Sequence, residues 1–192
     1  LGREVCRDMA FTTLGYVVMQ AQQRVGQPCW RYWFDYVAEA EHDAYPHGAW
    51  HGNEVPYVFD NLRLTDPVRQ YASEADLAFA AQVADYWAQF ARLASGEQTL
   101  SGAVRWPACL RGRDRLLRIG LHKRAGFKVE NRFMRARLAL FRRVMKHHAG
   151  INPIMRNCRH RPVATLSHMT TTGLITLPDA ESAKAWLISA NG

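Results

Sequence analysis

The hydrophobic pattern of the chain predicts one strand with particular clarity. Residues 30–37 are dense in aromatic and β-branched side chains and follow Pro28, which is typical of a strand. Polar positions are rare in this run, so we expect the strand to be covered on both faces. A second, shorter apolar run at residues 115–119 precedes Gly120 and predicts a last strand.

Apolar residues that recur every three or four positions predict three longer helices. The first spans residues 4–24 and the last spans residues 130–148. Between them, Ser73 is a suitable N-cap with acidic residues in the first turn, and the helix that it opens ends near Gly96. Residues 180–189 follow Pro178-Asp179 and predict one further amphipathic helix.

The segment between the aromatic strand and the next apolar run holds the best candidate for chemistry, His51. Gly48 and Gly52 flank this histidine and allow the backbone to turn sharply beside the imidazole. Glu54 begins an acid-first, apolar-next stretch in which Pro56 fits the first turn of a helix. The expected order is therefore a strand, a loop that carries His51, and a short helix.

These residues resemble the C-terminal part of the type-B carboxylesterases, which include cholinesterases and p-nitrobenzyl esterases. The resemblance rests on Phe34-Asp35-Tyr36 and on Gly48-Ala49-x-His51-Gly52-x-Glu54-Val55-Pro56-Tyr57-Val58-Phe59. It continues in Tyr86-Trp87-x-x-Phe90, for which packing is the expected role, and in Trp106-Pro107. No cysteine stands near residues 139 and 140 to pair with Cys6, as a partner does in cholinesterases, which points away from the animal cholinesterase branch.

The resemblance implies a fold, an activity and a catalytic residue. It implies an α/β fold, namely the C-terminal portion of an α/β-hydrolase with few strands, several helices and an incomplete sheet. Residues 1–150 would form this portion, and residues 151–192 would be a tail of unknown origin. In the family the histidine of this motif is the general base of a Ser-His-Glu/Asp triad, so this role falls on His51. The intact enzyme would act on a small-molecule carboxylic ester, with no metal or cofactor.

The other parts of a triad are not found in the sequence. Acyl transfer needs a nucleophile, a base, an orienting carboxylate and oxyanion donors, and α/β-hydrolases place the serine in a G-x-S-x-G turn ahead of the histidine. No G-x-S-x-G occurs here, and Ser73, Ser95 and Ser101 follow His51. We therefore expect the nucleophile and the acid to precede residue 1, and the fragment to be inactive alone.

The charge distribution supports an alternative from another class. The chain has a formal net charge of +8, and residues 107–150 hold 13 Lys and Arg against two Asp and Glu. Residues 111–146 would then belong to a non-catalytic helical domain that binds an acidic partner or nucleic acid. Aromatic residues are not interleaved with these arginines, so a solvated basic face is the favoured interpretation. Salt-dependent binding of the isolated chain to DNA or RNA would separate the two functions.

Metal sites, a disulfide framework and membrane spans are not expected. His42, His47 and His51 lack the helical spacing that presents two ligands on one face, and Cys158, His160 and His168 match no known ligand spacing. The four cysteines form no C-x-x-C pair, so buried or free thiols are expected. No apolar run approaches the 18 to 20 residues of a membrane span.

Overall fold

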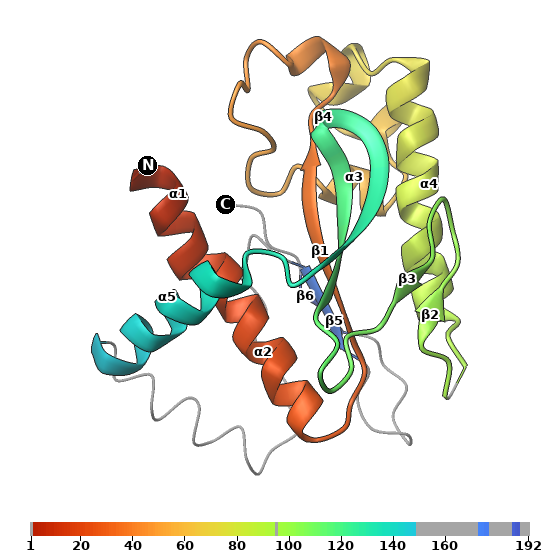
Figure 1. Ribbon diagram of the computed structural model, residues 1–192. Coiled ribbons are helices and arrows are strands. Elements are labelled where there is room, and N and C mark those ends of the chain that lie inside the picture. Colours follow the sequence, from red (N-terminus) through yellow and green to blue (C-terminus); the bar gives the residue numbers. More distant parts are fainter. Residues whose placement is uncertain (1, 95, 149–172, 177–185, 189–192) are drawn as a thin grey trace.

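The computed structural model describes residues 2–94, 96–148, 173–176 and 186–188, which form a mixed α/β structure (Figure 1). A π-helical turn (Asp8–Thr12) joins the first two helices, and three single-turn 3₁₀ helices (Glu39–Glu41, Leu62–Leu64, Val68–Gln70) lie between β1 and α4. The other elements, in chain order, are α1 (Gly2–Arg7), α2 (Thr13–Arg24), β1 (Cys29–Tyr36), α3 (Val55–Val58), α4 (Glu74–Ala91), β2 (Thr99–Leu100), β3 (Trp106–Pro107), β4 (Arg115–Asn131), α5 (Arg135–His148), β5 (Gly173–Thr176) and β6 (Trp186–Ile188).

The sheet is built around β1, which has a neighbour on each side. Its strand order is β4-β1-β5-β6. β1 runs parallel to β4, with Tyr32 opposite Leu117 and Phe34 opposite Ile119, and antiparallel to β5. The strand expected at residues 30–37 is therefore confirmed, and the small number of strands among several helices is consistent with a fragment of an α/β fold.

The side chains of β1 alternate between two buried layers, because successive residues of a strand point to opposite faces. Trp30, Tyr32, Phe34 and Tyr36 enter the larger core, which α4 and β4 complete. Cys29 enters a smaller cluster with residues of α2 and α5. Figure 1 shows α4 on one side of the sheet and α1, α2 and α5 on the other. Both faces of β1 are covered, as its aromatic pattern predicts.

The expected helix that begins after Ser73 is confirmed, and its first turn is also tied to β1. The Ser73 side chain accepts a hydrogen bond from the Asp76 backbone N–H, and the Asp76 carboxylate accepts one from the Ser73 N–H, which together form a capping box. The Asp76 carboxylate also accepts a hydrogen bond of 2.5 Å from the Tyr36 hydroxyl. The start of α4 is thereby held against the end of β1, where the His51 loop begins.

The strand expected at residues 115–119 is longer than its apolar pattern predicts, because β4 folds back on itself. His122 and Lys123 both have positive φ, which is the backbone conformation at the centre of a type I′ turn. The Asp114 carbonyl accepts a hydrogen bond from the Arg132 N–H, so the two ends of β4 meet. α5 consequently begins at Arg135, later than the predicted residue 130.

The last part of the chain contributes two short strands. β5 and β6 extend the sheet beyond β1, and both lie after residue 150. The helix expected over residues 180–189 is wrong at residues 186–188, which are extended and pair with β5. The remaining positions of that predicted helix lie outside the described residues.

Candidate functional site

His51 lies on the surface of the loop that joins β1 to α3, as the sequence predicts. Its side chain is exposed, and its ring centroid lies 6.4 Å from that of Phe11 in the π-helical turn. Gly48 and Gly52 both have positive φ, at 99° and 84°. Any other residue would strain the backbone at these two turns. The glycines thus have the role that the sequence assigned to them.

The loop that presents His51 is anchored on both sides of the histidine. Two residues after it, the Asn53 amide donates a hydrogen bond of 2.8 Å to the Tyr36 carbonyl at the end of β1. One residue before it, the Trp50 ring packs on the Tyr45 ring with centroids 4.1 Å apart. The imidazole is therefore exposed but is carried on a fixed backbone, as a proton-transfer group must be.

Asp35 fixes the beginning of the same loop through a close backbone approach. A Cβ atom on Gly48 would lie 2.7 Å from Oδ1 of Asp35, so only glycine fits there without a shift. The other carboxylate oxygen of Asp35 lies 3.0 Å from an Arg118 guanidinium nitrogen of β4. Burial raises the pKa of Asp35, and Arg118 opposes this shift. We assign this carboxylate a structural role in holding the loop on the sheet.

Glu54, to which the sequence assigned no chemical role, is buried beside the candidate histidine in the chain. Its side chain is 1% exposed, and its Oε2 has no hydrogen-bond partner among the described residues. Desolvation by burial raises its pKa to about 7. In the sequence it resembles an ordinary acid in the first turn of a helix, so its burial could not be foreseen from type and position. The chain therefore has, three residues after His51, a buried carboxyl group whose Oε2 accepts no hydrogen bond from the described residues.

The burial of Glu54 should make the stability of the chain depend on pH. The folded state keeps a proton on Glu54 between its ordinary pKa of 4.5 and about 7, whereas the unfolded chain loses that proton. The contribution is therefore fully present below pH 4.5 and is lost as pH rises to about 7, at a cost of about 3 kcal/mol. We expect Glu54→Gln to flatten this decline in the free energy of unfolding, measured by urea denaturation at a series of pH values.

A matched control comes from Glu97, which is exposed. Glu97→Gln should leave the decline between pH 4.5 and 7 as steep as in the unsubstituted chain. If the free energy of unfolding of Glu54→Gln declined between pH 4.5 and 7 as steeply as that of the unsubstituted chain, the Glu54 carboxyl would be hydrated. Its burial would then not govern the pH dependence.

The other histidines differ from His51 in their surroundings. Nε2 of His42 lies 2.9 Å from the Val37 carbonyl and 3.2 Å from the Lys123 carbonyl, so this ring joins the loop to β4. His47 is exposed near the tip of the loop. Within the described ranges no group of three or more His, Cys, Asp or Glu could hold a metal ion. The weaker cluster of Cys158, His160 and His168 lies outside the described residues.

Several large apolar side chains that are near His51 in the sequence are exposed. Tyr45, Val55, Phe59 and Leu64 are large and apolar, and each is at least one-third exposed, with Phe59 at 66% and Leu64 at 82%. These residues come from the loop itself, from α3 and from the turn that follows. Exposed apolar side chains are ordinary when they are scattered singly, and only a contiguous group marks a contact surface.

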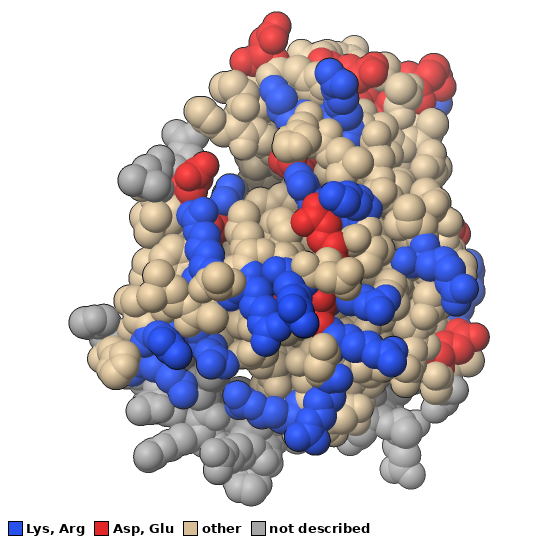
Figure 2. Space-filling view, viewed as in Figure 1, with Lys and Arg blue, Asp and Glu red and all other residues tan. Residues whose placement is uncertain are grey.

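The basic segment forms a charged face of the molecule. Figure 2 shows Lys and Arg gathered over one side, and the exposed cations of the segment include Arg111, Arg113, Arg132, Arg135 and Arg143. The aromatic rings of β4 and α5 are at least half-buried, as in the contact of Phe127 with Phe79. A base-stacking platform is therefore not found in this segment. The alternative of a helical domain is wrong in its architecture, because β4 (Arg115–Asn131) takes up much of the segment.

No helix in the described ranges is long and apolar enough to cross a membrane.

Comparison with known proteins assigns most of the chain to one family. A family model described as the carboxylesterase family matches residues 3–140, which include β1, the His51 loop, α4 and β4. Comparison with curated proteins gives no match. The family match ends within α5.

Proposed function

The chain belongs to the carboxylesterase family, and from this premise we propose that it supplies the catalytic general base, His51, of a serine carboxylic ester hydrolase. The serine nucleophile, the acid of the triad and the oxyanion donors would come from a part of the enzyme outside this sequence, which has no G-x-S-x-G turn. The chain would be the C-terminal portion of an α/β-hydrolase whose sheet is completed by that other part.

In this proposal His51 transfers a proton twice. It accepts the proton of the serine hydroxyl as the oxygen attacks the ester carbonyl, and it returns the proton to the departing alcohol. It then activates water in the same way to release the acid from the acyl-serine intermediate. Each step needs an imidazole that is open to a partner and rigidly placed. This sequence of steps requires neither a metal ion nor an organic cofactor.

The observation that carries the proposal is the setting of His51 in the fold. An exposed imidazole on an anchored loop at the carboxyl end of a parallel strand is placed where α/β folds build their active sites. Tyr45, Val55 and Phe59, which are near His51 in the sequence, are also exposed.

The proposal predicts that the chain alone is not an esterase. Without a nucleophile or oxyanion donors, the purified chain should hydrolyse p-nitrophenyl esters no faster than free imidazole at equal concentration. Absorbance of released p-nitrophenol measures the rate. A serine-directed phosphonate should fail to label the chain, and stoichiometric, saturable labelling would show that a complete triad is assembled within these 192 residues and overturn the division of roles.

A further inference from the structure

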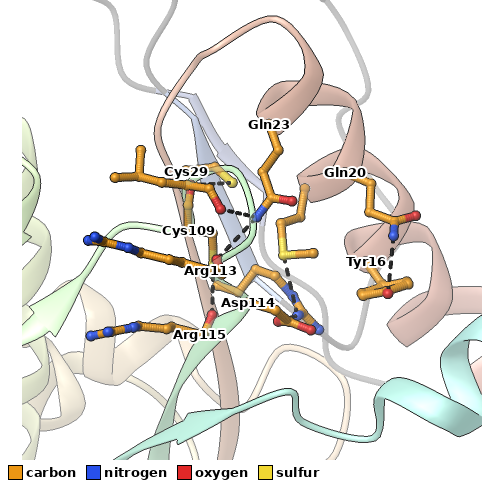
Figure 3. Close-up of polar contacts among 11 residues, drawn as sticks. Tyr16, Gln20, Gln23, Cys29, Cys109, Arg113, Asp114 and Arg115 are labelled. Atoms are coloured by element: carbon orange, nitrogen blue, oxygen red, sulfur yellow. Dashed lines mark hydrogen bonds and ion pairs between the residues drawn. The ribbon is translucent and has the colours of Figure 1, made fainter.

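Two cysteines that lie far apart in the sequence meet on the α2 side of the sheet. Cys29 is the first residue of β1, and Cys109 lies between β3 and β4. They face each other as an antiparallel bridge, in which the Cys109 N–H donates a hydrogen bond of 2.6 Å to the Cys29 carbonyl. Both side chains are completely buried and carry free thiols. Figure 3 shows the two residues side by side, near Gln23 of α2 and Asp114.

The geometry points to Cys29 and Cys109 as the two halves of a disulfide that forms when the chain folds in the presence of a small disulfide oxidant. Residues directly opposite in an antiparallel pair have Cα atoms about 4.5 to 5.5 Å apart. A disulfide spans Cα separations of about 4.4 to 6.8 Å. The usual backbone separation of such a pair therefore falls within the range that a disulfide spans.

The surroundings of the two thiols make them chemically different. The hydrogen bond that the Cys29 thiol makes to Cys109 lowers the pKa of Cys109, and the nearby Arg31 guanidinium lowers it as well. The same hydrogen bond and burial raise the pKa of Cys29. Arg31 is held in place by a contact of 2.7 Å with Asp114 and is itself completely buried. In the folded structure the thiolate is therefore favoured on Cys109 over Cys29.

The reaction balances with oxidised glutathione as the oxidant. The Cys109 thiolate attacks one glutathione sulfur, the glutathione disulfide breaks, and the first glutathione leaves as a thiolate that takes up a proton. Cys29 then gives up its proton, and its thiolate attacks the Cys109 sulfur and expels the second glutathione. Two protein thiols are oxidised to one disulfide, and one glutathione disulfide is reduced to two thiols. Because both cysteines are completely buried in the fold, this exchange takes place while the chain is folding, and the same disulfide results if Cys29 reacts with glutathione first and Cys109 then attacks it.

The bond would join the beginning of β1 to the chain that leads into β4. These two strands are parallel neighbours in the sheet, and the loop that carries His51 follows β1. The covalent link would enclose about 80 residues of the chain. Cross-links that close long loops restrict the unfolded chain most. The disulfide therefore stabilises the sheet without touching the candidate catalytic residue.

Mass spectrometry of the unsubstituted chain tests the inference. The chain is refolded from denaturant in a buffer of reduced and oxidised glutathione, its remaining thiols are alkylated, and it is digested with trypsin without reduction. The four cysteines fall in four separate tryptic peptides, with Cys29 in residues 25–31 and Cys109 in residues 106–111. We expect these two peptides to be recovered as one linked species, with Cys6 and Cys158 alkylated.

Other patterns would overturn the inference. Cys29 and Cys109 could be recovered separately alkylated, or disulfides could form with Cys6 or Cys158. Either result would show that the antiparallel pairing of Cys29 with Cys109 does not direct oxidation. The oxidised chain should also melt on the order of 5 to 15 °C above its reduced form. This difference should persist in Cys6→Ser and vanish in Cys109→Ser, and an equal difference in both variants would contradict the assignment.

Discussion

Replacing His51 by alanine should lower kcat for a p-nitrophenyl ester by about 10⁴ to 10⁶ in a complete carboxylesterase whose C-terminal portion is residues 3–140 of this chain. Members of a triad act as a unit, so the loss of the base removes nearly all of the gain that the nucleophile provides. The fold should be unaffected, because His51 is exposed and adds no volume to the core. The assay measures kcat and KM with far-ultraviolet circular dichroism as a check on folding.

The matched control is His47, which is exposed on the same loop four residues earlier. His47→Ala should change kcat by less than about tenfold, since the family motif gives this residue no chemistry. His42 is a poorer control, because its ring contacts the Val37 and Lys123 carbonyls and its loss would loosen the loop. If His47→Ala were crippling and His51→Ala mild, the catalytic motif would be misplaced on this loop.

A second large effect is expected at Gly120 of β4, where alanine should prevent the chain from reaching its fold. The φ angle of Gly120 is +85°, and an added Cβ would lie 2.4 Å from the Tyr36 backbone nitrogen and 2.7 Å from its Cα. Both atoms belong to β1, so neither can rotate away as a side chain would. We expect a loss of more than about 4 kcal/mol in the free energy of unfolding, measured by urea denaturation.

Gly112 provides the matched substitution for this experiment. Its φ is +77°, close to that of Gly120, but an added Cβ would meet nothing within 4 Å. Gly112→Ala should therefore cost only the strain of a left-handed backbone, about 1 to 2 kcal/mol. The difference between the two variants isolates the contact between β4 and β1. Equal losses would mean that the strands are farther apart at Tyr36 than the structure places them.

The sequence predicted those elements whose local pattern agrees with their surroundings in the fold. One face of β1 is fully aromatic, with Trp30, Tyr32, Phe34 and Tyr36, and it is buried as this pattern predicts. The same holds for α4, whose N-cap at Ser73 is visible in the sequence and forms the capping box. The loop with His51 was recognised because glycines mark its turns. These three features are local, and a single sequence records them directly.

Features that depend on distant parts of the chain could not be predicted in this way. The turn within β4 is made by His122 and Lys123, which are not residues that usually signal a hairpin. Glu54 reads as an acid in the first turn of a helix, but its side chain is 1% exposed, and this burial depends on tertiary contacts. The bridge between Cys29 and Cys109 depends on how β1 meets the chain before β4. In each case tertiary contacts decide the outcome.

Because β1 pairs with β4, a long stretch of chain must be synthesised between the two strands before they can form the sheet. Tyr32 pairs with Leu117, and at about 5 to 20 residues per second a ribosome needs roughly 4 to 17 s to make the chain between them. For the first part of that time the aromatic rings of β1 lack both β4 and α4; α4 (Glu74–Ala91) is made before Leu117, whereas α5 (Arg135–His148) is made after it. A nascent chain in this condition exposes apolar surface and is prone to aggregate, so slower synthesis of the chain between Tyr32 and Leu117 should increase aggregation.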